Sequence, residues 1–269
     1  EILIGLVGSE MCIRDRCCSI ELYTMRIKCI VTYDGTHFYG WQIQPDKRTV
    51  QEEIQKAIYK ITHEEVTIHS SGRTDAGVHA VGQVFHFDIN KEIPEKQWIR
   101  ALNNFLPEDI YIKDSFIVDE SFHARYSAKK KEYRYLVSTK PYNPIERLYV
   151  YQHNRPLDIE AMRECAQIFL GEHDFASFCV FNGLGDTIRV IETIDIQEED
   201  GIVTMRFVGN GFRRYMVRLI SGALIQVGSH WRTKELVEEL LESKGKKKCL
   251  FKAKPEGLYL QEVYYEEDD

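Results

Sequence analysis

The stretch SGRTDAGVHAVGQVFHF, residues 71–87, decides how the rest of the chain is interpreted. Gly72 and Gly77 permit backbone angles and close approaches that a side chain would forbid. Between them lie one cation, Arg73, and one carboxylate, Asp75. Apolar and polar residues alternate over 83–89, which predicts a strand after the loop. We therefore expect a loop that holds Asp75 at the lip of a cleft with Arg73 beside it; an ordinary polar turn is the alternative.

Hydrophobic periodicity on both sides of this stretch predicts an α+β protein. Strands are expected at 25–33, 66–70, 83–89, 110–118, 131–138, 188–196, 202–208 and 258–264, and helices at 50–61, 95–106, 159–170, 212–227 and 233–241. The residues Thr49 to Glu52 have the pattern of a capping box for the first helix. The sequence EEDG at 198–201 predicts a hairpin turn. We expect one α+β half at 25–121 and a second at 122–265.

The two ends of the chain differ from the rest. Residues 1–24 carry their basic side chains after an apolar run, which is the wrong order for a secretory signal. The segment GLVGSEMCIRDR resembles the translation of a sequencing adapter, so we expect 1–24 to be a non-native leader. Residues 266–269 are all acidic and are expected to form a tail.

Charge and cysteine content narrow the functional classes. The 35 Lys and Arg residues against 42 Asp and Glu give a net charge of −7. This charge argues against a polycation that coats nucleic acid, but it is compatible with a local basic cleft. No apolar run reaches the ~18 residues of a membrane span. The seven cysteines and nine histidines show no zinc-binding spacing, which predicts reduced thiols, no metal and a cytoplasmic protein.

Two basic segments contain interleaved aromatic residues. In FHARYSAKKKEYRY at 122–135, residues 125–134 hold two Arg and three Lys against one Glu. Phosphates favour such cations and unstacked bases favour aromatic faces, although a solvated strand edge would look the same. In NGFRRYMVR at 210–218, a helix would place Arg214 and Arg218 one turn apart. These arginines could contact phosphate or pair with a buried carboxylate; an ordinary surface helix is the alternative.

Five segments together resemble a known family. SGRTDAGVHAVGQVFHF, FHARYSAKKKEYRY, FLGEHDFASF, GFRRYMVRLISGALIQVG and GLYLQEVYY occur in the order found in the bacterial tRNA pseudouridine synthase A family. The resemblance covers about residues 25–265. It implies a pseudouridine synthase fold, with two α+β halves around a mixed, mostly antiparallel sheet and a central cleft. It also implies a cytoplasmic homodimer that converts uridine to pseudouridine at positions 38, 39 and 40 in the tRNA anticodon stem and loop, without cofactor or metal.

The resemblance further assigns roles to single residues. It makes Asp75 the catalytic aspartate and Arg218 the arginine that pairs with it. It makes Tyr133 a tyrosine that contacts the substrate, and Arg73 a residue that helps to flip the target base. Further substrate contacts are expected from Thr74, Arg125, Lys129, Arg214 and Leu260.

The chemistry of pseudouridine formation suits these residue types. The N1–C1′ bond breaks and C1′ joins C5, so the product is an isomer and no redox cofactor is needed. The base must leave its stack before it can turn. An ionised Asp75 would attack C1′ or assist elimination through a glycal, and both routes stay open. Tyr133 is a candidate acceptor for the C5 proton.

Two other functional classes remain open from the residues. A non-catalytic RNA-binding protein would use the same basic and aromatic segments but would leave Asp75 without a role. An aspartic hydrolase would explain the TDAG sequence at 74–77, but such enzymes need two carboxylates and the chain has one copy of this sequence.

Overall fold

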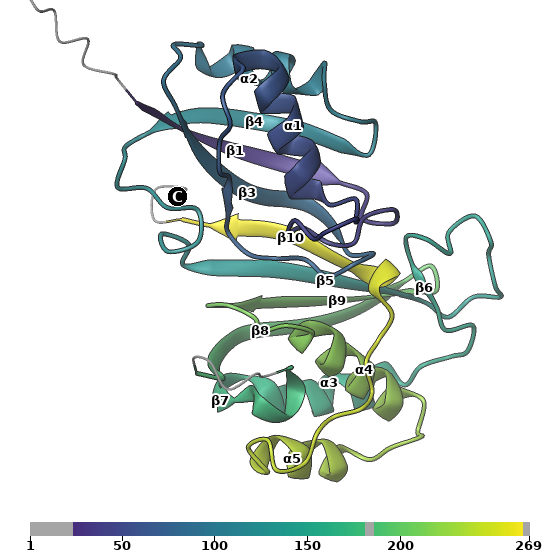
Figure 1. The fold of residues 1–269 in the computed structure, drawn as a ribbon. Helices are drawn as coiled ribbons and strands as arrows, with labels where there is room; N and C mark the ends of the chain where they lie inside the picture. Colours follow the sequence, from purple (N-terminus) through teal and green to yellow (C-terminus); the bar gives the residue numbers. More distant parts are fainter. Residues whose placement is uncertain (1–23, 181–185, 266–269) are drawn as a thin grey trace, which may run out of the picture.

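The computed structural model describes residues 24–180 and 186–265 (Figure 1). Its strands are β1 (Met25–Tyr33), β2 (His69–Ser70), β3 (His79–Ile89), β4 (Ile110–Val118), β5 (Lys130–Ser138), β6 (Tyr151–Gln152), β7 (Gly171–Asp174), β8 (Ile188–Glu199), β9 (Ile202–Gly209) and β10 (Leu258–Tyr264). Its α-helices are α1 (Val50–Thr62), α2 (Glu95–Asn103), α3 (Ile159–Ala166), α4 (Met216–Gly228) and α5 (Lys234–Glu242). The predictions for the leader and the acidic tail fall almost wholly outside the described residues.

The described strands form one large sheet in the order β4-β1-β3-β10-β5-β9-β8-β7, with β2 beside β3 and β6 beside β5. Most neighbouring strands are antiparallel, whereas the β3–β10 and β5–β6 pairs are parallel. The predicted α+β class with a mixed, mostly antiparallel sheet is therefore confirmed.

The last strand of the chain lies in the middle of the sheet. In Figure 1, β10 runs between β3 and β5, with α1 and α2 beside the strands on one side of it and α3, α4 and α5 beside those on the other. Leu260 of β10 lies opposite Ala80 of β3 and opposite Tyr133 of β5. This strand joins the two predicted halves into one sheet, and the division at 121/122 stays a prediction.

β3 is a central strand, and it is buried along nearly its whole length. Phe85 and Phe87 point into the core and are fully buried, and the Phe87 ring meets the edge of the Trp98 ring from α2 at 5.2 Å between centroids. Truncating such a buried aromatic side chain to alanine costs about 3–5 kcal/mol. The core on this side therefore fixes β3, and β3 fixes the end of the loop that precedes it.

The hairpin prediction is confirmed by its turn. Asp200 and Gly201 alone connect β8 to β9, with φ values of 48° and 66°. Two residues with positive φ are typical of the turn whose twist matches that of the flanking strands. The helix expected at 159–170 is shorter than predicted, because α3 ends at Ala166 and a short 3₁₀ turn follows at Gln167–Phe169. Gly171, the next residue after the expected helix, has a positive φ of 89°.

Three local predictions are wrong in detail. Thr49 precedes α1, but its hydroxyl makes no capping hydrogen bond, and Glu52 pairs with Lys56 one turn further along instead. The strand expected at 66–70 is limited to His69–Ser70. The helix expected from residue 212 begins at Met216, because Tyr215 has a φ of 64° and such left-handed backbone cannot continue into an α-helix.

Candidate active site

The carboxylate of Asp75 lies between two guanidinium groups. It stands in the loop from β2 to β3, and 20% of its side chain is exposed. Its Oδ2 is 3.6 Å from Nη1 of Arg218, and its Oδ1 is 4.0 Å from Nε of Arg214. Arg218 comes from α4, so the tertiary structure brings together a loop of the first half and a helix of the second.

Two glycines in the segment after β1, Gly35 and Gly40, pack closely against the backbone of the loop that carries Asp75. Gly40 has a φ of 90°, and a Cβ at this position would lie 2.5 Å from the carbonyl oxygen of Thr74. A Cβ at Gly35 would lie 2.0 Å from the carbonyl oxygen of Val78. The Trp41 amide donates to the Thr74 carbonyl at 3.1 Å. Sequence reasoning missed this contact between segments, although the two glycines of YDGTHFYGW were a visible signal.

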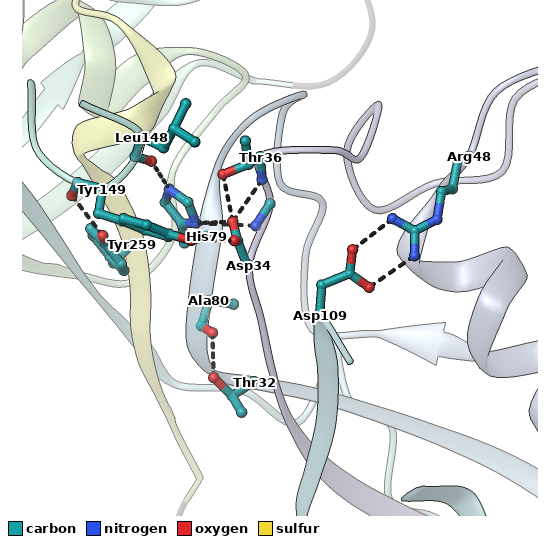
Figure 2. Close-up of polar contacts among 11 residues, drawn as sticks. Thr32, Asp34, Thr36, Arg48, His79, Ala80, Asp109, Leu148, Tyr149 and Tyr259 are labelled. Carbon is teal, nitrogen blue, oxygen red and sulfur yellow. Dashed lines mark hydrogen bonds and ion pairs between the residues drawn. The ribbon is translucent and has the colours of Figure 1, made fainter. Parts of the chain in front are cut away.

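A histidine anchors the C-terminal end of the same loop (Figure 2). His79 is almost fully buried, and burial lowers its pKa in spite of the nearby Asp34 carboxylate, so the imidazole is neutral at pH 7. Its Nδ1 accepts a hydrogen bond from the Gly35 amide at 3.1 Å, and its Nε2 donates to the Leu148 carbonyl at 3.0 Å. The Tyr149 hydroxyl donates to Asp34 at 2.8 Å. Three separate segments thus converge where the loop enters β3.

The segment that supports the loop is itself tied to the sheet (Figure 2). Both amino groups of the Arg48 guanidinium donate to the Asp109 carboxylate, at 2.6 and 2.8 Å. The Asp109 carbonyl accepts from the Asp34 amide at 3.0 Å, and the Arg48 carbonyl accepts from the Tyr39 amide at 2.9 Å. Such bidentate pairs hold geometry as well as charge. Arg48 therefore holds the 34–41 segment against the start of β4.

Backbone contacts fix the position of Arg218. The residue is 7% exposed, and its Nε donates to the Ala253 carbonyl at 2.8 Å. The Ala253 amide in turn donates to the Arg218 carbonyl at 3.0 Å. Because Nε is held in this way, the terminal Nη1 is directed at Asp75. The arginine is an oriented partner for the carboxylate rather than a mobile surface cation.

Three cationic side chains lie around the ring of Tyr215. These contacts were not predicted from the sequence. The ring centroid lies 4.8 Å from the Arg214 guanidinium, 5.3 Å from that of Arg218 and 4.4 Å from the Lys252 ammonium. Arg214 also donates to the Tyr215 hydroxyl at 3.0 Å. Cation–π contacts hold like charges together near the carboxylate. The predicted helical spacing of Arg214 and Arg218 is wrong, yet both reach Asp75 because the left-handed Tyr215 turns the chain.

Burial and charge act in opposite directions on Asp75. Burial is the largest influence and raises the pKa of its carboxyl group, while Arg218, Arg214 and Lys252 lower it, and the net shift is upward. A carboxylate with a raised pKa is a better base and nucleophile than one stabilised by water. This combination of burial and nearby cations suits a carboxylate that acts, in its ionised form, as a nucleophile or base.

The side chain of Tyr133 lies near Asp75. It is 8% exposed, and its ring meets the edge of the Phe212 ring at 5.2 Å between centroids. Burial raises the pKa of Tyr133, and the neighbouring Tyr33 and Asp75 raise it further. The phenolate is therefore rare at neutral pH, which argues against Tyr133 as the C5 proton acceptor.

Two further residues predicted to contact substrate are buried, as Tyr133 is. Leu260 has no exposed surface, because β10 is a central strand with a partner on either side. Thr74 is 7% exposed, and its hydroxyl lies 2.7 Å from that of Tyr33. Leu260 belongs to the core of the sheet in this geometry, and Thr74 ties the loop to β1.

The remaining predicted contacts are on the surface. Arg73, Arg125 and Lys129 are all exposed. No hydrogen bond or ion pair joins the Arg73 side chain to another described residue, so it is free to meet a ligand. The basic run 129–131 is not uniform, however: Lys130 pairs with Glu192 at 2.7 Å, whereas Lys131 turns inward and donates to the Ser71 carbonyl at 2.6 Å.

The sequence of the chain matches that of a known family. The sequence profile described as tRNA pseudouridine synthase matches residues 29–127 and 165–266, which together make up well over half of the chain. The chain belongs to the tRNA pseudouridine synthase family. Pseudouridine synthases are isomerases that modify RNA, so the protein is an isomerase of this class, as the sequence resemblance predicted.

Two relatives of high sequence identity agree with the family match. The tRNA pseudouridine synthase A of Geobacillus sp. (strain WCH70) is 45% identical over 244 residues, covering 90% of this chain and 98% of that protein. The Bacillus subtilis (strain 168) protein of the same name is 44% identical over 246 residues, covering 90% and 100%. A solved Cbf5-Nop10-Gar1 complex gives a TM-score of 0.30 at 16% identity, covering 74% of this chain and 54%, about half, of that one.

The described residues offer no metal cluster and no membrane-spanning helix. In residues 24–180 and 186–265, no three His, Cys, Asp or Glu side chains are grouped as a metal ion would need. No helix in these ranges combines the length and apolar character needed to cross a bilayer. The described cysteines, Cys29, Cys165, Cys179 and Cys249, are free and buried. Cys12, Cys17 and Cys18 lie outside the described residues.

Proposed function

We propose that the protein converts uridine to pseudouridine at positions 38, 39 and 40 in the anticodon stem and loop of tRNA, with Asp75 as its catalytic carboxylate. The observation that carries the proposal is the placement of Asp75, one-fifth exposed, between an oriented Arg218 and an exposed Arg214. In chains that merely bind RNA, a carboxylate would be expected to repel phosphate. Here its raised pKa and its cationic partners suit covalent chemistry instead.

In the proposed reaction the target base first leaves its stack, which costs a few kcal/mol. The exposed and unpaired Arg73 enters the space that the base leaves, and the flipped base stacks on the ring of Tyr133. Stacking on an aromatic ring returns about 1–3 kcal/mol. The function of Tyr133 in this proposal is to position the base, since its raised pKa disfavours an ionised hydroxyl.

The ionised Asp75 then acts on the sugar. It attacks C1′ as the N1–C1′ bond breaks, or it removes a sugar proton as a glycal forms. The uracil turns and C5 bonds to C1′. This step displaces the Asp75 carboxylate from C1′ on the first route, and on the second route the sugar proton returns from Asp75 to C2′. C5 then loses its hydrogen to a base and N1 gains a proton, so the product is an isomer of uridine and the reaction needs no co-reactant. Arg218 stabilises the carboxylate whenever it carries its negative charge.

The substitution Asp75→Asn tests the proposal. It removes the nucleophile with almost no change in volume, so RNA binding and thermal unfolding should be unchanged while tritium release from C5-labelled tRNA falls at least about 10³-fold. Asp46→Asn is the matched control, because Asp46 is exposed and has a φ of 56°, which asparagine tolerates. Normal turnover by the Asp75 variant would contradict the proposal.

Carbodiimide primer extension on treated tRNA locates the modified positions. Signals at 38, 39 and 40 are expected, and signals confined to another arm of the tRNA would contradict the substrate assignment. RNA binding without any pseudouridine would favour the alternative, a non-catalytic RNA-binding protein. The proposal includes a cytoplasmic homodimer, supported by the family resemblance, and analytical ultracentrifugation would test the oligomeric state.

A further inference from the structure

Lys131 is an inward-pointing ammonium group without a carboxylate partner. Its Nζ donates one hydrogen bond, to the Ser71 carbonyl at 2.6 Å, and none of the described carboxylates is within ion-pair distance. Its neighbours in the run differ, because Lys130 pairs with Glu192 at 2.7 Å. A charge withdrawn from water without a counter-charge is costly, so its retention calls for a functional reason.

A glycine of the catalytic loop lies beside this ammonium. A Cβ at Gly72 would stand 3.0 Å from Nζ of Lys131. Because glycine has no side chain, no atom of residue 72 occupies that position next to Nζ. Gly72 is three residues before Asp75, so an anion held here would be next to the reacting nucleotide.

Two further cations act electrostatically on the same ammonium. Arg125 from the segment before β5 and Arg189 from β8 both exert repulsion on the Lys131 ammonium. Lys131 lies opposite Gly209 on β9, and the Arg189 Nε lies 3.7 Å from where a Cβ at Gly211 would stand. The residue opposite Lys131 on β10 is Val263, which carries no charge.

We propose that Lys131, Arg125 and Arg189 bind a phosphate of the substrate RNA backbone beside the nucleotide on which Asp75 acts. The inference rests on the proposed function, which makes RNA the ligand. Three cations with no carboxylate facing the Lys131 ammonium are an anion site, and the phosphodiester is the anion that every RNA carries. Arg189 also pairs with a carboxylate. Its Nη1 donates a hydrogen bond to Asp186 at 2.6 Å, and this contact orients the guanidinium group.

The proposed phosphate site predicts that the affinity for RNA depends on pH. Burial, with the repulsion of Arg125 and Arg189, lowers the pKa of Lys131 to about 8 in the free protein. A bound phosphate favours the charged form and raises that pKa again, so binding takes up a proton above pH 8. Affinity is therefore greatest below pH 8 and falls as the pH rises through that value.

Fluorescence anisotropy with a rhodamine-labelled anticodon stem-loop RNA tests this at pH 7 and pH 9, at constant low salt. The wild-type affinity should fall by up to about tenfold, because about one free molecule in ten keeps the Lys131 proton at pH 9. Lys131→Arg should abolish the fall, since its guanidinium stays charged at both pH values. Lys131→Gln should bind weakly at both, with a salt slope reduced by about one.

Lys130→Gln is the matched control, with the same change of charge one residue away, and it should keep the wild-type pH dependence. A flat wild-type affinity, or a fall that persists in Lys131→Arg, would overturn the phosphate site. If Lys131→Gln fails to fold in thermal unfolding, the arginine variant decides alone.

Pseudouridine formation is measured on the same RNA, so that the two proposals can fail separately. If binding depends on pH but no pseudouridine forms, the proposed function is contradicted and the phosphate site is not. If pseudouridine forms but binding does not depend on pH, the phosphate site is contradicted and the proposed function is not.

Discussion

The substitution Gly40→Ala tests whether the segment after β1 holds the catalytic loop in place. At a φ of 90°, a residue with a side chain costs about 1–3 kcal/mol in backbone strain. The new Cβ would stand 2.5 Å from the Thr74 carbonyl oxygen and 3.1 Å from the Asp75 carbonyl carbon, so the loop must move. That movement breaks two hydrogen bonds, one from the Trp41 amide to the Thr74 carbonyl and one between the hydroxyl groups of Tyr33 and Thr74, at about 1 kcal/mol each.

A second glycine provides the control for backbone strain. Gly171 has a φ of 89°, almost the same as Gly40, but a Cβ there meets nothing within 4 Å. It begins β7, at the edge of the sheet away from Asp75. Gly171→Ala therefore carries the strain without the collision, and its free energy of unfolding should fall by about 1–3 kcal/mol with an unchanged rate.

Urea unfolding followed by circular dichroism, together with tritium release from C5-labelled tRNA, separates the two variants. Gly40→Ala should lose about 2 kcal/mol more than Gly171→Ala, the part due to the broken hydrogen bonds. Its rate should fall by about 100-fold, because a displacement near 1 Å at a reacting group has an effect of that size. Equal losses of stability and equal rates in the two variants would refute the reasoning.

Two further predictions concern the residues around the carboxylate. Arg214→Gln removes a charge that lowers the pKa of Asp75, so this pKa rises further. Since the active carboxylate exists above its pKa and is lost as pH falls through it, the acid limb of the pH–rate profile should move to higher pH; an unmoved limb would contradict this. Tyr133→Phe keeps the ring and should lower single-turnover rates less than about tenfold, whereas a loss above 100-fold would make the hydroxyl a proton carrier.

Much of the secondary structure could be predicted because it depends on neighbours in the chain. Alternation over 83–89 predicted the strand that the structure extends to His79–Ile89. The Asp200–Gly201 turn and the final strand at Leu258–Tyr264 follow from local residue types in the same way. The start of α5 is similar, since the Thr233 hydroxyl accepts a hydrogen bond from the Leu236 amide and the helix begins where the pattern indicated.

The candidate site shows where such local reasoning ends. The sequence by itself marked Asp75, because a carboxylate between two glycines is visible in one loop, and the family resemblance added Arg218. It could not distinguish Lys130 from Lys131, since their opposite surroundings are set by Glu192 on another strand and by Ser71 in the catalytic loop. These partners are distant in the chain and become neighbours only when the strands pair.

The tertiary structure alone decided how the carboxylate is held. Gly40 touches Thr74, and Tyr215 collects Arg214, Arg218 and Lys252 beside Asp75. Composition and periodicity describe which face of an element is buried, but they do not say which residue of another element fills the space opposite. The physical reason is that burial and charge, which set the pKa and the reach of each group, are sums over all neighbours in space rather than along the chain.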